Sequence, residues 1–182
     1  HFPILFVWGS MGSGKTSLLR DVFWALFGVK AQSDPYSCTD TSFAIVKKLC
    51  STNGCPIIMD EHKPSDMPHG RADQLHRLIR RAYSGEAEER GRTDLSIHSS
   101  ELQAPWCIAG ETSPDDPATK ERLLQVCPNR RFIDNNTEAR DAFRTLRNMP
   151  LEKLTASYIQ FTLQKDDITA ELVDAREWTD TY

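Results

Sequence analysis

The most informative residues form a glycine-rich octapeptide with the pattern G-x-x-x-x-G-K-[ST]. It consists of Gly9, Ser10, Met11, Gly12, Ser13, Gly14, Lys15 and Thr16. Glycines at this spacing let the backbone turn tightly and point its N–H groups inward, where they can cradle a chain of phosphates. The Lys15 ammonium would reach the β- and γ-phosphates, and the Thr16 hydroxyl would coordinate Mg²⁺. The octapeptide therefore predicts a nucleotide site that holds ATP and Mg²⁺.

A pair of acids, Asp60 and Glu61, follows the apolar segment 56–59. Asp60 at the end of a strand could hold the Mg²⁺ hydration shell, while Glu61 could polarise a water for in-line attack on the γ-phosphate. An acid directly after the metal-side Asp is typical of P-loop ATPases that hydrolyse their nucleotide, and most small-molecule kinases lack it. The pair therefore indicates hydrolysis, with a solvated acidic strand end as the alternative.

A third polar cluster, Glu111-Thr112-Ser113, follows the apolar segment 104–109. If this strand lies between the P-loop strand and the Asp60 strand, its end faces the γ-phosphate. Glu111, Thr112 or Ser113 could then sense that phosphate or orient the water. The alternative is that Thr112 or Ser113 caps a helix ahead of Pro114.

A hydrolysing site usually needs a cation to neutralise the charge of the transition state. We expect Arg122 to act as an arginine finger on a neighbouring subunit. Arg130 and Arg131 are the next candidates for this role, and Arg90 and Arg92 rank behind them. The alternative for each is an ordinary surface ion pair.

A second group of arginines surrounds a predicted hairpin and could contact a phosphate backbone or a subunit interface. It comprises Arg77, Arg80, Arg81, Arg90 and Arg92. Glutamates at 86, 88 and 89 are interleaved and few aromatics are available for stacking, so a mixed-charge surface stays open as an alternative. His62 and Lys63 could couple the nucleotide to DNA or to a partner, or they could lie in a solvated loop, while His69 and His76 are expected at the surface.

Alternating strands and helices must position these groups. We expect buried strands over 3–8, 56–61, 104–109 and 131–134, a short strand within 31–40, and a hairpin within 86–102. Helices are expected over 16–27, 40–50, 71–83, 116–126, 137–148 and 151–164. This order predicts an α/β fold, a three-layer α/β/α sandwich with a mainly parallel P-loop sheet of about five strands and C-terminal helices.

Composition limits the class of protein. The 182 residues suit one domain, with residues 1–150 as a P-loop core and residues 151–182 as an acidic helical extension, a lid or a linker. The net charge of −4 lies wholly in that extension. No apolar stretch approaches the roughly 18 residues of a membrane span, and five cysteines without a CxxC pair favour a reducing cytoplasm. Strand-like sequence directly after His1 leads us to expect further domains of a longer polypeptide.

The chain resembles the ring-forming P-loop ATPases of the additional-strand, catalytic-glutamate group. Nearest are the superfamily 3-like helicase domains of phage and plasmid primase-helicases. GSMGSGKT at 9–16, IIMDEHKP at 57–64, the segment 84–102 and WCIAGETS at 106–113 carry the resemblance, over roughly residues 3–135. Family members usually have Asn where this chain has Gly110-Glu111-Thr112. The resemblance implies hexameric rings, an arginine finger at Arg122 and a pore hairpin over 86–98 that pulls single-stranded DNA.

These observations together predict an ATP-hydrolysing motor domain, a DNA helicase or translocase of a mobile-element replication protein. An alternative is an ATP-dependent switch in defence or signalling that oligomerises on a partner without translocating DNA. A small-molecule phosphotransferase is a third class, against which Glu61 and the lack of an arginine-rich lid count.

Overall fold

The computed structural model describes residues 4–29, 34–91 and 97–165. Its strands are β1 (Ile4–Trp8), β2 (Tyr36–Ser37), β3 (Ile57–His62), β4 (Ala87–Gly91), β5 (Ile97–Glu101), β6 (Trp106–Gly110) and β7 (Leu123–Val126). Its helices are α1 (Lys15–Leu18), η1 (Leu19–Trp24), α2 (Ser42–Leu49), η2 (Pro64–Asp66), α3 (Arg71–Ser84), α4 (Pro117–Lys120), α5 (Arg130–Asn135), α6 (Thr137–Arg147) and α7 (Leu151–Leu163).

Within the described residues, five parallel strands form one sheet in the order β2-β3-β6-β1-β7. The strand β6 lies between the P-loop strand β1 and the Asp60 strand β3, as predicted. All five residues of β6 are buried, because a central parallel strand is covered on both faces. This order confirms the α/β fold and brings the carboxyl ends of β1, β3 and β6 to one edge of the sheet.

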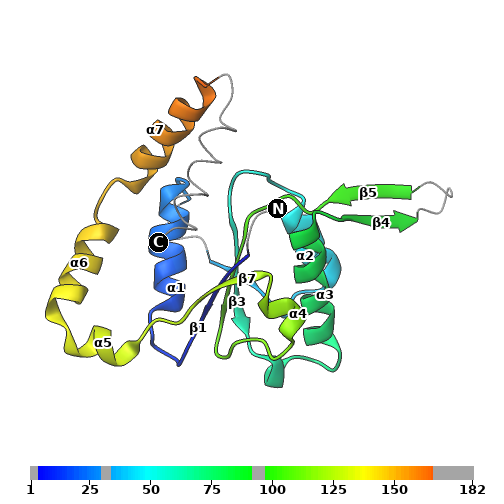
Figure 1. The fold of residues 1–182 in the computed structure, drawn as a ribbon, viewed down its shortest axis with the longest axis horizontal. Helices are drawn as coiled ribbons and strands as arrows, with labels where there is room; N and C mark the ends of the chain where they lie inside the picture. Colours follow the sequence, from blue (N-terminus) through cyan, green and yellow to red (C-terminus); the bar gives the residue numbers. More distant parts are fainter. Residues whose placement is uncertain (1–3, 30–33, 92–96, 166–182) are drawn as a thin grey trace.

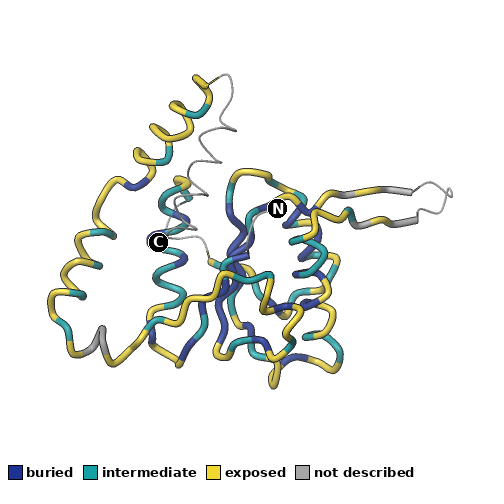
Figure 2. The backbone as a smooth tube through the Cα atoms, in the orientation of Figure 1, coloured by how far each residue is buried: buried dark blue, intermediate teal, exposed yellow. Residues whose placement is uncertain are grey.

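Two hydrophobic clusters, one on each face of the sheet, follow from the alternation of side chains along the strands. Phe6, Met59 and Ile108 pack with α2 and α3 in one cluster, whereas Val7 and Ile58 pack with Leu19 and Trp24 of η1 in the other. Figure 1 shows the helices on either side of the sheet, and Figure 2 shows the burial concentrated between them. The result is the expected three-layer sandwich.

The hairpin β4–β5 is a separate two-stranded sheet that projects away from the sandwich (Figure 1). Its antiparallel register runs from Ala87 opposite Glu101 to Gly91 opposite Ile97. This confirms the hairpin predicted over 86–102, and the connection 92–96 lies outside the described residues.

Two predicted elements are wrong. The helix expected over 116–126 stops after α4, and residues 123–126 form strand β7, paired in parallel with β1 from Ile4–Leu123 to Val7–Val126. The strand expected over 131–134 lies within helix α5. The wrongly assigned stretches, 123–126 and 131–134, have only four residues each, too few for periodicity to assign to helix or strand. Residues 123–126 form a strand because they pair with the free edge of β1, where the pairing satisfies the backbone N–H and C=O groups of that edge.

The helix after the P-loop is continuous with η1, a six-residue π-helical stretch with wider turns than an α-helix. Towards the other end of the chain, α6 lies alongside α1 and α7 continues beyond the end of that helix, both with mostly exposed residues (Figures 1 and 2). None of the helices in the described ranges combines the length and apolar character needed to cross a bilayer.

Candidate nucleotide and catalytic site

The glycine-rich loop joins β1 to α1 and adopts the conformation that its glycines allow. Gly12 and Gly14 have φ of 76° and 85°, values that side chains other than glycine rarely tolerate. The Lys15 ammonium donates to the carbonyl oxygens of Gly9 and Ser10 at 2.8 and 2.9 Å, so its charge lies at the mouth of the loop. A turned glycine loop and a cation therefore lie together where the sequence predicts phosphate binding.

Thr16 and Asp60 meet at this loop although 44 residues separate them in the chain. The Thr16 hydroxyl donates to Asp60 Oδ2 at 2.6 Å. A hydroxyl and a carboxylate are the hard oxygen ligands that Mg²⁺ prefers, together with waters and phosphate oxygens. The two residues thus fit the Mg²⁺ site predicted for them.

A β-bulge at the end of β3 sets the direction of Asp60 and Glu61. The register with β6 runs from Met59–Ile108 to His62–Gly110, so two residues of β3 oppose Ala109 alone. Glu61 takes a φ of 66°, and Asp60 Oδ1 accepts a 2.7 Å hydrogen bond from the Glu61 amide. In a regular strand, neighbouring side chains point to opposite faces, whereas here both acids line one cavity.

Ser37 holds the Glu61 side chain from the neighbouring strand β2. Its hydroxyl donates to Glu61 Oε2 at 3.0 Å and contacts Thr39 Oγ1 at 2.7 Å. Ser37 was not predicted from the sequence, because a two-residue strand carries no periodic pattern. Its only sequence signal is a hydroxyl residue in a short strand between two predicted helices.

The cavity between these groups has a volume of about 470 Å³. It is lined by Met11, Gly12, Lys15, Thr16, Thr39, Asp60, Glu61, Lys63, Asp66, Gly110 and Glu111. The lining combines residues of the loop and two lysines, Lys15 and Lys63, with four carboxylates. This arrangement can bind a polyphosphate and present a general base to it.

The predicted sensor residues lie at the end of β6. Glu111 lines the cavity and forms a 3.5 Å ion pair with Lys63, whose ammonium also contacts Asp66 at 2.9 Å. Hydrogen bonding and charge from Asp66, with a smaller effect of Glu111, raise the pKa of Lys63. Thr112 is exposed in the bend that follows and does not line the cavity.

The arginines proposed to neutralise the transition state differ in where they lie relative to the P-loop. Arg122 lies in the turn before β7, at the opposite end of the strand from the P-loop, where it donates to the Ala118 carbonyl and lies over the Tyr83 ring. Arg130 follows β7 and donates to Met11 O at 3.0 Å, with its guanidinium against Gly12. Arg131 is exposed on α5. Within one chain the structure brings Arg130 to the loop and leaves Arg122 away from it.

Two arginines of α3 bind within the molecule. Arg80 pairs with Asp116 at 2.7 Å and joins α3 to α4, and hydrogen bonding from Thr119, with the Arg80 charge, lowers the pKa of Asp116. Arg81 donates to the Ala87 carbonyl at 2.6 Å and supports the base of the hairpin. Arg77 is exposed, Arg90 lies in β4, and Arg92 lies outside the described residues.

His62 and His76 are buried, which corrects the expectation of a loop and a surface position. The His62 ring is stacked at 5.6 Å from His76 and edge-on at 5.1 Å from Phe6. Burial, with a contribution from His76, lowers the pKa of His62 to about 4, and burial also lowers the pKa of His76. Because the bulge turns His62 inward directly after Glu61, the histidine packs behind the catalytic edge.

No protein-family model and no curated protein matches this chain. Among solved structures, the active helicase SCCmec type IV Cch aligns with a TM-score of 0.52 and 17% identity, over 86% of this chain and 28% of its own. The JCV helicase bound to an acetamide inhibitor aligns with a TM-score of 0.46 and 14% identity, over 99% of this chain and 52% of its own. The chain thus spans about half or less of these proteins.

The identities are low, so this similarity concerns the fold. The chain therefore has a helicase-like α/β fold.

Proposed function

We propose that this chain is the ATP-hydrolysing motor domain of a DNA helicase or translocase, part of a mobile-element replication protein. The observation that carries the proposal is the cavity in which Lys15, the Thr16–Asp60 pair and Glu61 meet. A P-loop and two acids with distinct partners supply the parts that phosphoryl transfer to water needs.

The residues have separate roles in this proposal. The loop amides and Lys15 bind the β- and γ-phosphates, and Thr16 and Asp60 hold Mg²⁺. Bound Mg²⁺ would neutralise phosphate charge during transfer. Glu61, fixed by Ser37 and by its own backbone conformation, accepts a proton from the attacking water. Glu111 lies close enough to the cavity to respond to the γ-phosphate.

The projecting hairpin β4–β5 supports the motor part of the proposal. It connects through residues 102–105 to β6, whose far end carries Gly110 and Glu111 at the cavity. Arg81 fixes its base to α3. In a homohexameric ring, hairpins of this kind would face a central channel and hold single-stranded DNA, and an arginine of the next subunit, with Arg122 as the candidate, would complete the site.

The test is ATP hydrolysis by the full 182-residue chain with and without single-stranded DNA. We expect DNA to stimulate turnover, Lys15→Ala to abolish nucleotide binding, and Glu61→Gln to retain binding while lowering turnover by about two to four orders of magnitude. The exposed Glu121→Gln is the matched control and should turn over ATP like the wild type. Full activity of Lys15→Ala would refute the ATPase itself.

Hydrolysis that depends on Glu61 but ignores DNA would refute the motor and leave the ATPase. The oligomerising switch would then be the better description, and a protein partner would be the next object of search.

A further inference from the structure

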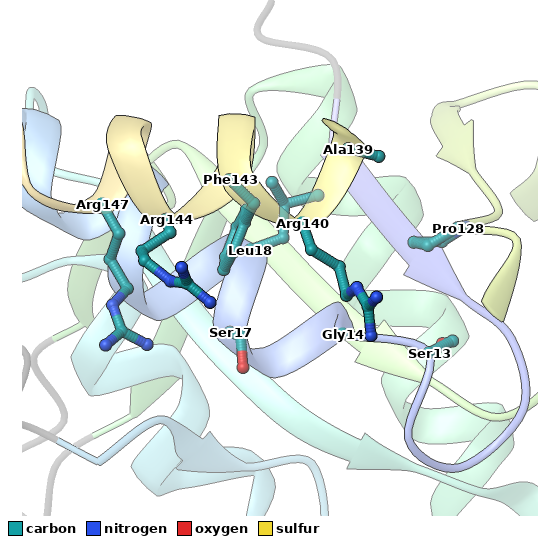
Figure 3. A pocket seen from close by; sticks show the side chains of 10 residues that line it. All are labelled: Ser13, Gly14, Ser17, Leu18, Pro128, Ala139, Arg140, Phe143, Arg144 and Arg147. Carbon is teal, nitrogen blue, oxygen red and sulfur yellow. The ribbon is translucent and has the colours of Figure 1, made fainter. Parts of the chain in front are cut away.

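A second cavity, of about 430 Å³, lies on the other side of the P-loop, between α1 and α6. Ten residues line it: Ser13, Gly14, Ser17, Leu18, Pro128, Ala139, Arg140, Phe143, Arg144 and Arg147. In Figure 3, Phe143 and Arg140 extend from α6 toward α1, with Phe143 beside Leu18 and Arg140 reaching toward Gly14. The cavity therefore begins at the loop and continues along the helix.

An ion pair of Asp21 connects the two helices that border this cavity. Asp21 is on the π-helical segment η1, 7% exposed, and pairs with Arg20 at 2.9 Å and with Arg147 of α6 at 3.7 Å. A hydrogen bond from the Ala139 amide to the Asn136 side chain caps the start of α6. The ion pair of Asp21 with Arg147 thus joins the C-terminal end of α6 to η1, the continuation of α1.

The position of the cavity determines which part of a nucleotide can reach it. Ser13 and Gly14 belong to both the P-loop and this cavity, whereas Lys15, Thr16 and the acids line the catalytic cavity. A triphosphate with its γ-phosphate near Glu61 must therefore leave the loop toward α6. This argument depends on the proposed function, because it takes the P-loop to bind a nucleotide.

We propose that the cavity between α1 and α6 receives the nucleoside half of the nucleotide, with the base stacked on Phe143 and the sugar and α-phosphate near Arg140 and Arg144. An aromatic ring and an aliphatic side chain suit the faces of a base, and guanidinium groups suit phosphate oxygens. The cavity is of the size that small-molecule sites have.

The same lining predicts which bases are accepted. The ten lining residues include no Asp, Glu, Asn or Gln side chain that could read the amino group of adenine. Stacking depends on the face of a base and tolerates different edges. The site therefore accepts guanine as well as adenine, and we expect ADP and GDP to bind the chain within about tenfold of each other.

The test compares binding of ADP, GDP and inorganic tripolyphosphate to the full chain by calorimetry with Mg²⁺ present. Base stacking is worth enough that Phe143→Ala should weaken ADP binding by about tenfold or more. Tripolyphosphate has no nucleoside, so its affinity should stay unchanged. Phe161→Ala, on the exposed part of α7, is the matched control, and Phe143→Leu keeps an apolar side chain without a ring and should lose most of the same affinity.

The outcomes separate this inference from the proposed function. Wild-type protein that binds neither nucleotides nor tripolyphosphate would refute both. The cavity assignment alone would be refuted if Phe143→Ala and Phe143→Leu left nucleotide affinity unchanged. It would also be refuted if these substitutions lowered the affinities for nucleotide and for tripolyphosphate equally. Discrimination of more than about a hundredfold between ADP and GDP would refute stacking as the mode of recognition.

Discussion

At the scale of single residues, the site depends on a strained glutamate. Glu61 has a left-handed backbone conformation that costs a residue with a side chain of the order of 1 kcal/mol or more. The surrounding contacts hold it there: its amide donates to Asp60 and its carboxylate accepts from Ser37. Strain of this kind is stored where the direction of a side chain matters for function, and here it directs Glu61 into the cavity that Lys15, Thr16 and Asp60 also line.

Ser37→Ala should therefore slow hydrolysis without weakening nucleotide binding. A hydrogen bond to a charged group contributes about 1.5–3 kcal/mol, so kcat should fall by about tenfold or more while KM stays near its original value. Steady-state ATPase assays measure both constants. Ser51→Ala removes an exposed hydroxyl outside the cavity and serves as the control, and an unchanged kcat for Ser37→Ala would contradict the positioning role.

His62 makes stability depend on pH. Its pKa is about 4 in the folded chain, below the ordinary value of 6.5, because burial disfavours the charged ring. As the pH falls, the unfolded chain therefore takes up a proton on His62 at a higher pH than the folded chain does. The stability that this residue contributes above pH 6.5 is lost as the pH falls toward 4, and the loss is at most about 3 kcal/mol. His76 acts in the same direction.

Urea unfolding between pH 7 and pH 4.5, without nucleotide and with EDTA, measures this dependence. His62→Gln cannot take up the proton and should flatten the curve, whatever its effect on stability at pH 7. His69 is exposed, so His69→Gln should leave the slope as it is. A slope that is the same in both variants would show that other groups cause the dependence.

The sequence predicts that the loop, Asp60 and Glu61 lie together at one site, because each belongs to a local sequence pattern. Ser37 and the inward turn of His62 were not predictable from it. Ser37 reaches Glu61 across the sheet, and a bulge reverses the alternation that would put His62 on the other face. Such contacts depend on strand register, which a single sequence does not display.

At the scale of elements, the close approach of β6 to β3 restricts Gly110. A Cβ on Gly110 would lie 2.8 Å from the His62 carbonyl oxygen and 3.1 Å from the Phe6 ring. Neither the backbone nor a core ring can give way easily, so Gly110→Ala should destabilise the chain by about 1–3 kcal/mol. Denaturant unfolding measures this, with Gly54→Ala, which meets no atom within 4 Å, as the control. Equal stability of the two variants would contradict the close approach.

Elements with many residues and a clear period were predicted within a residue or two, as in α3 and α6. The failure at 131–134 concerns four residues, and the failure at 116–126 concerns the four residues 123–126. There the deciding interaction is a tertiary one, the pairing of β7 with the open edge of β1. Local sequence could not reveal that edge, because the residues that form it are more than a hundred positions away.

At the scale of the whole molecule, the proposed function requires a cation from a second copy. The turnover per chain should therefore rise with protein concentration as rings assemble and then reach a plateau, which ATPase assays beside sedimentation would follow. Arg122→Ala should lower the plateau and leave ADP affinity unchanged. Arg71 at the start of α3 binds Ser42 and Gln74, so Arg71→Ala is the control. Turnover independent of concentration would point to Arg130 acting within its own chain.

The position of β6 also has a mechanical consequence. It begins close to the hairpin, ends at the catalytic cavity, and is hydrogen-bonded to β1 and β3 along its length. Tension applied to the hairpin along the direction of β6 would load its hydrogen bonds to β1 and to β3 in shear. These hydrogen bonds would then resist together instead of opening one after another. Five residues of strand, about 17 Å long, would thus behave as a stiff rod between the hairpin and Gly110, and strain at one end would reach the other with little loss.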